Sequence, residues 1–295
     1  MSASRLVCCC GFTVILSPIF FMRKSKVLAK LRAGKVARIF CIGSPLGMAP
    51  AMAAHFHYDG IWVDGEHRVW DPREIDTMLA RHHAADIDCI WRPATKEKNG
   101  LYRLLEDGAT GLMIPHVATA EQARFLVQAI KFPPMGDRGY DGAGRDAAFF
   151  FGAPADYIAQ ANQQTCLVVQ IETPEALGNV DAIAAVEGVD VLFVGPGDLS
   201  LRLGCSPHVS DPRMLEAQRL VAAAAKKHGK AWGRPVRADE DARVIVELGA
   251  QFVAMGSEFV ALTNHLTQCD REFDALLGES AGQPSAAGGA TTKAY

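Results

Sequence analysis

Eight short runs rich in β-branched and apolar residues alternate along the chain with segments of helical pattern. The runs begin at Ala37, Gly60, Asp86, Gly111, Cys166, Asp190, Lys230 and Phe252. Because these runs are largely apolar on both faces, each expected strand must be covered on both sides, which is typical of a parallel sheet. Eight such units that close on themselves form a (β/α)8 TIM barrel, and we predict this α/β fold.

Sequence signals for helix N-termini lie between the runs and indicate where each expected helix begins. Candidate N-caps stand before the expected helices at Asp71, Thr119, Thr173 and Asp211. Three of them precede a proline directly, and two are followed three positions later by Glu or Gln, as in a capping box. A doubly wound open sheet is the alternative fold. It is disfavoured because no GxGxxG motif follows the first strand and eight regular units favour closure.

Composition limits the class of protein and its partners. The chain has 295 residues, of which 49% are hydrophobic and 21% charged, so it can bury a large core and is not a disordered or disulfide-rich chain. The first 58 residues hold eight Lys or Arg and no Asp or Glu, which leaves a net charge of -11 on the rest. Such an acidic body repels phosphate backbones, so we expect no nucleic-acid partner.

Single, dispersed cysteines outside the first ten residues favour a reducing, cytoplasmic location.

Two end segments fall outside the expected barrel. The apolar stretch within residues 1–21 is interrupted and shorter than the ~20 residues of a spanning helix, so we expect no membrane partner. It lacks a small-residue cleavage site, although an acid-free basic start also suits a transit peptide, and a targeting segment is not excluded. We therefore expect a non-core extension over 1–21, with Met22 as the real start, a barrel over 22–276 and a flexible tail over 277–295.

The carboxyl ends of the expected strands carry a polar set, and barrel chemistry is located on the loops that follow these ends. The set comprises Asp64 and His67 in DGEH, Arg92, Gln170 and Glu172 in QIET, and Asp198 and Ser200 in GPGDLS. Each member alone has an ordinary explanation: a surface histidine, an ion-pair partner, or a carboxylate that favours a helix start. Together at one mouth, they indicate an active site.

Two of these carboxylates predict a metal site. Glu172 and Asp198 follow neighbouring strands, whose spacing of ~4.8 Å lets both side chains reach one hard cation. Since no His or Cys ligand accompanies them, the pair predicts Mg²⁺ or Mn²⁺, with Co²⁺ as a further option. Water and substrate oxygens are expected to fill the remaining positions.

Some weaker signals lie outside this set. The glycine-rich RGYDGAGR, which begins at Arg138, follows no strand and is expected to be a mobile active-site loop rather than a phosphate cradle. His116, beside Pro115 at the end of the fourth strand, is a further position that can touch substrate. His82 and His83 lie on an expected helix without ligand spacing.

Six motifs in order resemble the HpcH/HpaI class II pyruvate aldolases between Met22 and Leu276. The matching segments are DGEH (64–67), RP at Arg92, LLEDG (104–108), PPMGDRG (133–139), QIETPEAL (170–177) and VEGVDVLFVGPGDLS (186–200). The resemblance implies a barrel with a swapped C-terminal helix, a homo-oligomer that is a hexamer, a divalent metal and no Schiff-base lysine.

The resemblance also implies a role for each matching residue. Glu172 and Asp198 become the metal ligands, and pyruvate is held by Gln170, Gly197, Asp198 and Ser200. His67 becomes the proton acceptor, and Arg92 stabilises the enolate.

The resemblance also implies an acidic residue that acts on His67. Glu106 stands where the family has Asp, and it is expected to raise the basicity of His67, with Asp107 and Asp64 as competitors for that role.

The implied reaction is the reversible cleavage of a 4-hydroxy-2-oxo acid to pyruvate and an aldehyde through a pyruvate enolate. The partners are then a small 2-oxo acid and an aldehyde. One alternative is an acyl-CoA carbon-carbon lyase of the citrate lyase β type, which needs a basic groove for the CoA phosphates. The other is a barrel that only binds small acids, which should have lost a ligand or the base. The first strand, FCIGSP, departs from the family and leaves the aldehyde open.

Overall fold

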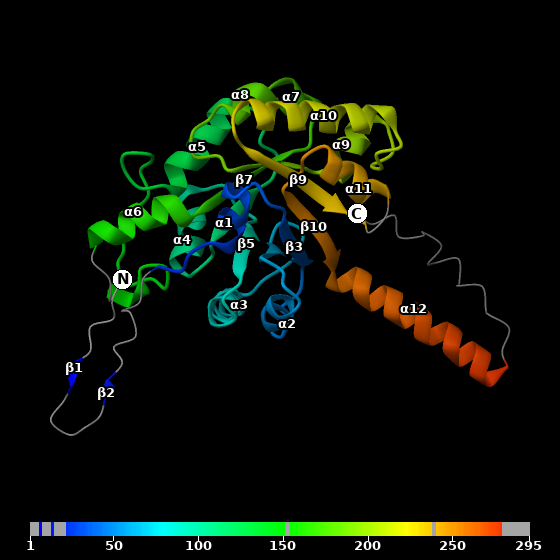
Figure 1. Ribbon diagram of the computed structural model, residues 1–295, viewed down its shortest axis with the longest axis horizontal. Helices are drawn as coiled ribbons and strands as arrows, with labels where there is room; N and C mark the ends of the chain where they lie inside the picture. Colours follow the sequence, from blue (N-terminus) through cyan, green and yellow to red (C-terminus); the bar gives the residue numbers. More distant parts are fainter. Residues whose placement is uncertain (1–5, 8–12, 15–21, 151–153, 238–239, 279–295) are drawn as a thin grey trace.

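The computed structural model describes residues 6–7, 13–14, 22–150, 154–237 and 240–278. Its centre is a closed parallel barrel in the order β10-β3-β4-β5-β6-β7-β8-β9 (Figure 1). The strands are β3 (Ala37–Ile42), β4 (Gly60–Asp64), β5 (Asp88–Arg92), β6 (Gly111–Ile114), β7 (Cys166–Ile171), β8 (Val191–Val194), β9 (Ala231–Val236) and β10 (Phe252–Ser257). Each begins within two residues of its predicted start, so the (β/α)8 barrel is confirmed and the open sheet is wrong.

Helices connect the strands and cover the outside of the barrel. They are α1 (Lys26–Arg32), α2 (Ala49–His55), α3 (Pro72–Ala84), α4 (Lys98–Glu106), α5 (Ala120–Ile130), α6 (Pro154–Gln164), α7 (Pro174–Gly178), α8 (Val180–Ala184), α9 (Pro196–Leu203), α10 (Pro212–Lys227), α11 (Glu240–Glu247) and α12 (Glu258–Leu277), with a 3-10 turn at Ala148–Phe150. The four predicted N-caps are confirmed, because each side chain accepts a hydrogen bond from a backbone N–H of its helix. Those of α3 and α5 are complete capping boxes.

Helix α1 closes the amino end of the barrel. Its side chains Val27 and Leu28 are buried with the residues that fill the barrel interior. The carboxylate of Asp88, at the start of β5, accepts hydrogen bonds from the Ser25 hydroxyl (2.5 Å) and from the backbone N–H of Val27 (3.0 Å). The guanidinium of Arg23 adds an ion pair to Asp88 at 2.6 Å. This buried anchor covers the amino end, so the open end of the barrel is its carboxyl end.

The alternation of side chains along each strand places polar groups at that open end. Trp62, Ile90, Val168 and Phe193 belong to the cluster inside the barrel. Because side chains of a strand repeat every two residues, the next inward positions toward the carboxyl ends are Asp64, Arg92, Gln170 and Gly195. Asp64 and Arg92 are also register partners across β4 and β5, which brings a carboxylate beside a guanidinium.

The loop that contains RGYDGAGR lies at the amino end, away from this mouth. Asp146 N–H donates to the backbone oxygen of Glu106 at 3.4 Å, and the Arg145 guanidinium donates to the backbone oxygen of Asp107. Glu106 is the last residue of α4 and Asp107 is its C-cap, so both acceptors lie in the turn that leads into β6. Arg138 is buried and pairs with Asp146 at 2.6 Å. Within one chain, the expectation of an active-site loop is therefore wrong, because α5 carries the chain down the barrel before this loop begins.

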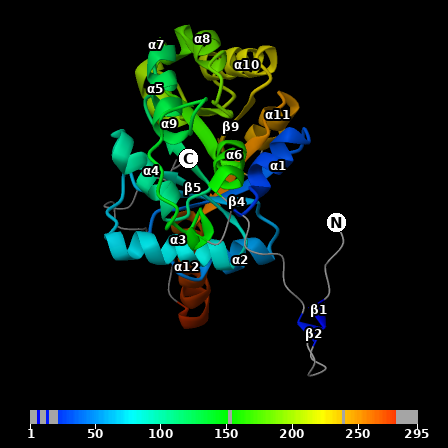
Figure 2. The same ribbon diagram turned by 90° about the vertical axis from the view of Figure 1, so that its left-hand side faces the viewer.

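Helix α12 extends away from the barrel in both views (Figures 1 and 2). None of its residues is buried, and its apolar side chains are exposed, including Leu262, Leu266, Phe273 and Leu276.

The predicted extension over 1–21 and tail over 277–295 lie almost entirely outside the described residues. Within 1–21, only the short strands β1 (Leu6–Val7) and β2 (Thr13–Val14), which pair antiparallel, are described. No helix among the described residues combines the length and apolarity needed to cross a bilayer.

His82 on α3 makes folding sensitive to pH. Its ring is buried, Nδ1 lies 2.7 Å from the backbone oxygen of Met78, and Nε2 has no hydrogen-bond partner among the described residues. This burial lowers the pKa of His82 from 6.5 to about 4. The unfolded chain therefore binds this proton more tightly than the folded chain between those values.

We expect the free energy of unfolding to fall as the pH drops from about 6.5 toward 4, by ~3 kcal/mol from this residue alone. Above pH 6.5 the ring is neutral in both states, and its contribution is constant. Urea unfolding of the wild type and of His82→Gln between pH 4.5 and 7.5 checks the expectation. Their difference in stability should change along this range, and a constant difference would contradict the assignment.

Candidate active site

Arg92 is the centre of a buried network at the mouth of the barrel. Its Nε donates to Asp64 Oδ1 at 3.0 Å, and Nη2 lies 2.8 Å from the same oxygen. Nη1 donates to Gln170 Oε1 at 3.3 Å and pairs with Glu66 Oε2 at 3.0 Å. The guanidinium carbon lies 4.7 Å from the ring centre of Trp62. Arg92 is thus held as a fixed positive charge by groups from two other strands, β4 and β7, and from the loop after β4.

Asp64 also orders the DGEH loop. Its Oδ1 accepts hydrogen bonds from the backbone N–H groups of Glu66 (3.0 Å) and His67 (3.2 Å). Asp64 therefore positions the loop and Arg92, and it contacts the backbone of His67 rather than its ring.

Glu172 is a buried carboxylate with a partner at each oxygen. Oε1 accepts a hydrogen bond from the backbone N–H of His116 at 2.7 Å and lies 3.0 Å from His116 Nδ1. Oε2 accepts from Gln170 Nε2 at 3.2 Å. Burial raises the pKa of Glu172, and the nearby Asp198 and Glu66 carboxylates raise it further. A cation at this point would relieve that repulsion.

The turn into α9 is shaped to admit the Glu172 carboxylate. Gly195 is the N-cap of α9, and a Cβ at this position would collide with Glu172 Oε2. Only a residue without a side chain leaves room for that oxygen. The first turn of α9 then carries Gly197 and Asp198, so the helix start and the carboxylate face one another.

The other predicted residues of α9 have defined partners. Asp198 is 38% exposed at its side chain and pairs with Arg202 one turn later, at 2.5 Å. Gly197 is buried, and the buried hydroxyl of Ser200 donates to the Gly197 carbonyl at 2.9 Å. The contact seen for the Ser200 hydroxyl is thus internal to α9, whereas Asp198 acts electrostatically on Glu172.

These donors fit a hard divalent cation in part. No group of three or more His, Cys, Asp or Glu in the described part of the chain is arranged to hold a metal ion. A pair of carboxylates that relies on water and substrate for the remaining ligands is compatible with that finding. Glu172 is buried against like charge, which suits a cation ligand, while Asp198 must share or release Arg202 to join it.

His67 lies exposed at the rim, with Glu66 as its neighbour. Its side chain is 56% exposed, and Nε2 lies 3.5 Å from Glu66 Oε2. The same carboxylate contacts Arg92 and, through Oε1, lies 3.6 Å from His116 Nε2. Glu66 belongs to the DGEH motif but was not among the predicted site residues. The sequence alone does not show that its carboxylate lies between Arg92, His67 and His116.

Glu106 is not brought to His67 within one chain. It ends α4 at the amino end of the barrel, whereas His67 follows the carboxyl end of β4. Burial raises the pKa of Glu106, and the charges that act on it belong to Arg138, Asp146, Asp141 and Arg103. Its neighbour Asp107 pairs with Arg103 at 3.0 Å. The predicted pairing of either with the His67 ring thus has no contact in the described chain.

Two further basic residues lie at the site. His116 was predicted from the sequence only as a weaker candidate, and Lys96 was not predicted. His116 follows β6 and bridges Glu172 and Glu66, as described above. Its φ of 53° is left-handed, an uncommon conformation for a residue with a side chain. Lys96, in the loop after β5, donates to the His116 carbonyl at 3.2 Å. Its position four residues beyond the strand end was the only available sequence signal.

A closed eight-stranded parallel barrel with this polar cluster at its carboxyl end matches a known family. The sequence pattern of the HpcH/HpaI aldolase/citrate lyase family covers residues 39–264. The chain therefore belongs to this family, as the motifs had predicted.

Individual relatives agree with this assignment. The chain is 40% identical over 209 residues to a hydroxypyruvate/pyruvate aldolase of Delftia acidovorans. The aligned segment covers 70% of this chain and 76% of the relative. It is also 40% identical over 205 residues to a 5-keto-4-deoxy-D-glucarate aldolase of Escherichia coli K12, covering 68% and 78%. A solved HpcH/HpaI aldolase from Desulfitobacterium hafniense superposes with a TM-score of 0.78 at 30% identity, covering 83% and 95%.

Proposed function

We propose that this protein is a metal-dependent aldolase that reversibly cleaves a 4-hydroxy-2-oxo acid to pyruvate and an aldehyde. The observation that carries the proposal is the contact between two buried networks at the barrel mouth. Arg92 supplies a fixed positive charge, and Gln170 links it to the buried Glu172 carboxylate. The two aldolase relatives at 40% identity favour this chemistry over an acyl-CoA lyase or a barrel without catalysis.

Glu172 and Asp198 are the proposed ligands of the divalent cation, Mg²⁺ or Mn²⁺. When bound, such a cation supplies positive charge for the keto oxygen and carboxylate of pyruvate. Gln170, Ser200 and the turn at Gly197 are the proposed contacts of the same substrate. Their support is position, because Gln170 lies on β7 two residues before Glu172, and Gly197 and Ser200 lie in α9, whose N-cap Gly195 meets the Glu172 carboxylate.

His67 is the proposed base. It removes a proton from the methyl group of pyruvate, and the remaining electron pair forms an enolate whose oxygen faces Arg92. The enolate carbon adds to the aldehyde carbon, and the proton that His67 removed is returned to the aldehyde oxygen, which becomes the 4-hydroxyl. Cleavage is the same sequence reversed. We assign the orientation of the His67 ring to Glu66, which lies at 3.5 Å, in place of Glu106.

The oligomeric state is part of the proposal. The exposed apolar side chains of α12 need a covering surface, and a second copy of the chain supplies one if α12 is swapped between copies. A homo-oligomer, and specifically the hexamer, is therefore expected by sedimentation equilibrium, and a monomeric mass would contradict it. A cytoplasmic location is also proposed, from the dispersed cysteines, and cell fractionation tests it.

The experiment that tests the function is isotope exchange without an aldehyde. Purified protein is incubated with pyruvate in heavy water, with Mg²⁺, with Mn²⁺ and after exhaustive chelation. Exchange of the methyl protons that depends on the added metal supports the proposal, and condensation with a panel of aldehydes then defines the reaction. Absence of exchange under all conditions would overturn the proposed function.

A further inference from the structure

The start of α12 is fastened to the end of β3 at the mouth of the barrel. Glu258, the first residue of α12, accepts hydrogen bonds at Oε1 from the backbone N–H groups of Gly43 (2.5 Å) and Ser44 (2.9 Å). The Ser44 hydroxyl donates to the same oxygen at 3.1 Å. The rest of α12 extends away from the barrel (Figures 1 and 2), but these charge-assisted hydrogen bonds fix its first turn.

Phe259, the next residue of α12, reaches the loop that follows β4. The guanidinium carbon of Arg68 lies 5.0 Å from the centre of the Phe259 ring, within the range of a cation–π contact. Gly43 lies against both side chains, because a Cβ at this position would come within 3.0 Å of Arg68 Cγ and of Phe259 Cε2. The absence of a side chain at Gly43 thus leaves room for Arg68 and Phe259 to meet.

Arg68 in turn holds the backbone of His67. Its Nη1 donates to the His67 carbonyl at 2.8 Å, while the His67 N–H donates to Asp64 Oδ1 at 3.2 Å. The His67 side chain is 56% exposed and its polar contact is with Glu66, so packing contributes little to its position. The two backbone contacts therefore set where the ring lies at the rim of the site.

We propose that Phe259 and Arg68 are positioning residues for the base. The start of α12 holds the Arg68 guanidinium, and Arg68 holds the His67 backbone in the orientation that proton transfer needs. The inference rests on the proposed function, because it takes His67 as the base. Neither residue is assigned a contact with the substrate, and both act through His67. Such support matters because a displacement of about 1 Å can slow a reaction by about 10²-fold.

Proton exchange of pyruvate in heavy water, with the metal-loaded protein, tests the inference. Arg68→Ala should lower kcat for exchange by roughly 10- to 100-fold, whereas KM for pyruvate and the metal affinity should stay near the wild-type values. Phe259→Ala removes only the support of the guanidinium and should lower kcat by roughly 3- to 30-fold. Phe259→Tyr keeps an aromatic face for the cation and should retain most of the activity, whereas Phe259→Leu should not.

Two sets of double variants separate positioning from a general effect on folding. If Phe259 acts through Arg68, Phe259→Ala should cause no further loss of exchange in the Arg68→Ala protein. If both residues act through the base, neither change should slow exchange further in the His67→Ala protein. Additive losses in either background would overturn the inference.

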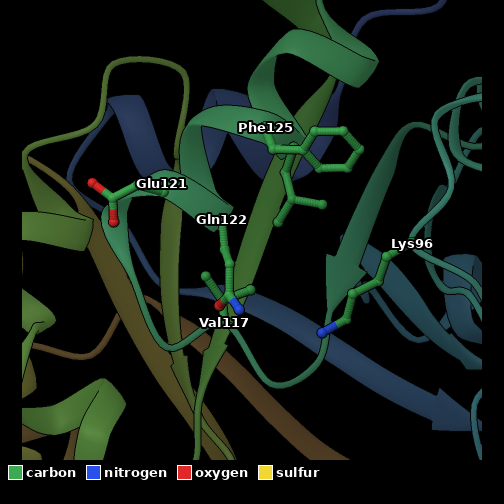
Figure 3. Close-up of a pocket in the computed structure, with 6 residues that line it drawn as sticks. Lys96, Val117, Glu121, Gln122 and Phe125 are labelled. Atoms are coloured by element: carbon green, nitrogen blue, oxygen red, sulfur yellow. The ribbon is translucent and has the colours of Figure 1, made fainter.

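Phe125→Ala is the matched control and should exchange pyruvate protons at the wild-type rate. Phe125 is 51% exposed, close to the 46% of Phe259, and lines a separate pocket beside α5 with Lys96 and Gln122 (Figure 3). Wild-type exchange in Arg68→Ala, a change that leaves α12 intact, would overturn the inference. Exchange by the wild-type protein, together with slow exchange by His67→Ala, keeps that outcome distinct from a failure of the proposed function.

Discussion

Replacing Glu172 by glutamine should abolish metal-dependent proton exchange in pyruvate while the barrel remains folded. The amide keeps the shape of the side chain and can still accept from His116 N–H, but it removes the charge that binds a cation. We expect the exchange rate to fall by about 10⁴ or more, to that of the chelated wild type, since the metal and its charge stabilisation are lost together. Metal titration by calorimetry, alongside exchange, checks both parts of the expectation.

The matched control is Glu175→Gln, which changes an exposed glutamate of the same segment, on α7. It should bind metal and exchange protons like the wild type. Because burial and the neighbouring carboxylates raise the pKa of Glu172, loss of its charge should offset the loss of one acceptor oxygen, and the variant should lose little stability at neutral pH. Metal affinity retained in Glu172→Gln would show that the cation is held elsewhere, and the ligand assignment would be wrong.

Changing His67 to alanine should slow exchange of the pyruvate methyl protons by roughly 10² to 10⁴, the usual contribution of a positioned general base. The ring is more than half exposed and its polar contact is with Glu66, so its removal should cost little stability. Metal binding should hardly change, because no contact joins the His67 ring to Glu172. Exchange measured in pyruvate alone isolates this step from aldehyde binding.

His55→Ala is the control for this change, since His55 is exposed at the end of α2 near the amino end of the barrel. Glu66→Gln should act in the same direction as His67→Ala but less strongly, because it alters the orientation and charge around the ring without removing it. Wild-type exchange in His67→Ala would mean that another group takes the proton. His116 would then be the next candidate, because it contacts both Glu172 and Glu66.

The sequence alone determined the barrel and the end of it that carries the site. Runs such as GIWVDG and CLVVQIE encode strands locally, and the caps at Asp71 and Thr119 encode where helices begin. The two-residue period then places Arg92 and Gln170 on the inner face at the mouth. These features were predictable because each depends on neighbouring residues and on the order of the elements.

Contacts between distant loops were decided only by the tertiary structure. The pairings of Glu66 with His116 and of Lys96 with the His116 carbonyl depend on how the chain leaves β6, where the left-handed φ of His116 turns its ring toward Glu172. Glu106 lies at the opposite end because α4 returns along the barrel before it stops. Strand order fixes which loops share a mouth. The direction of a side chain within those loops depends on backbone angles and on packing between segments far apart in sequence, and a linear pattern does not specify either.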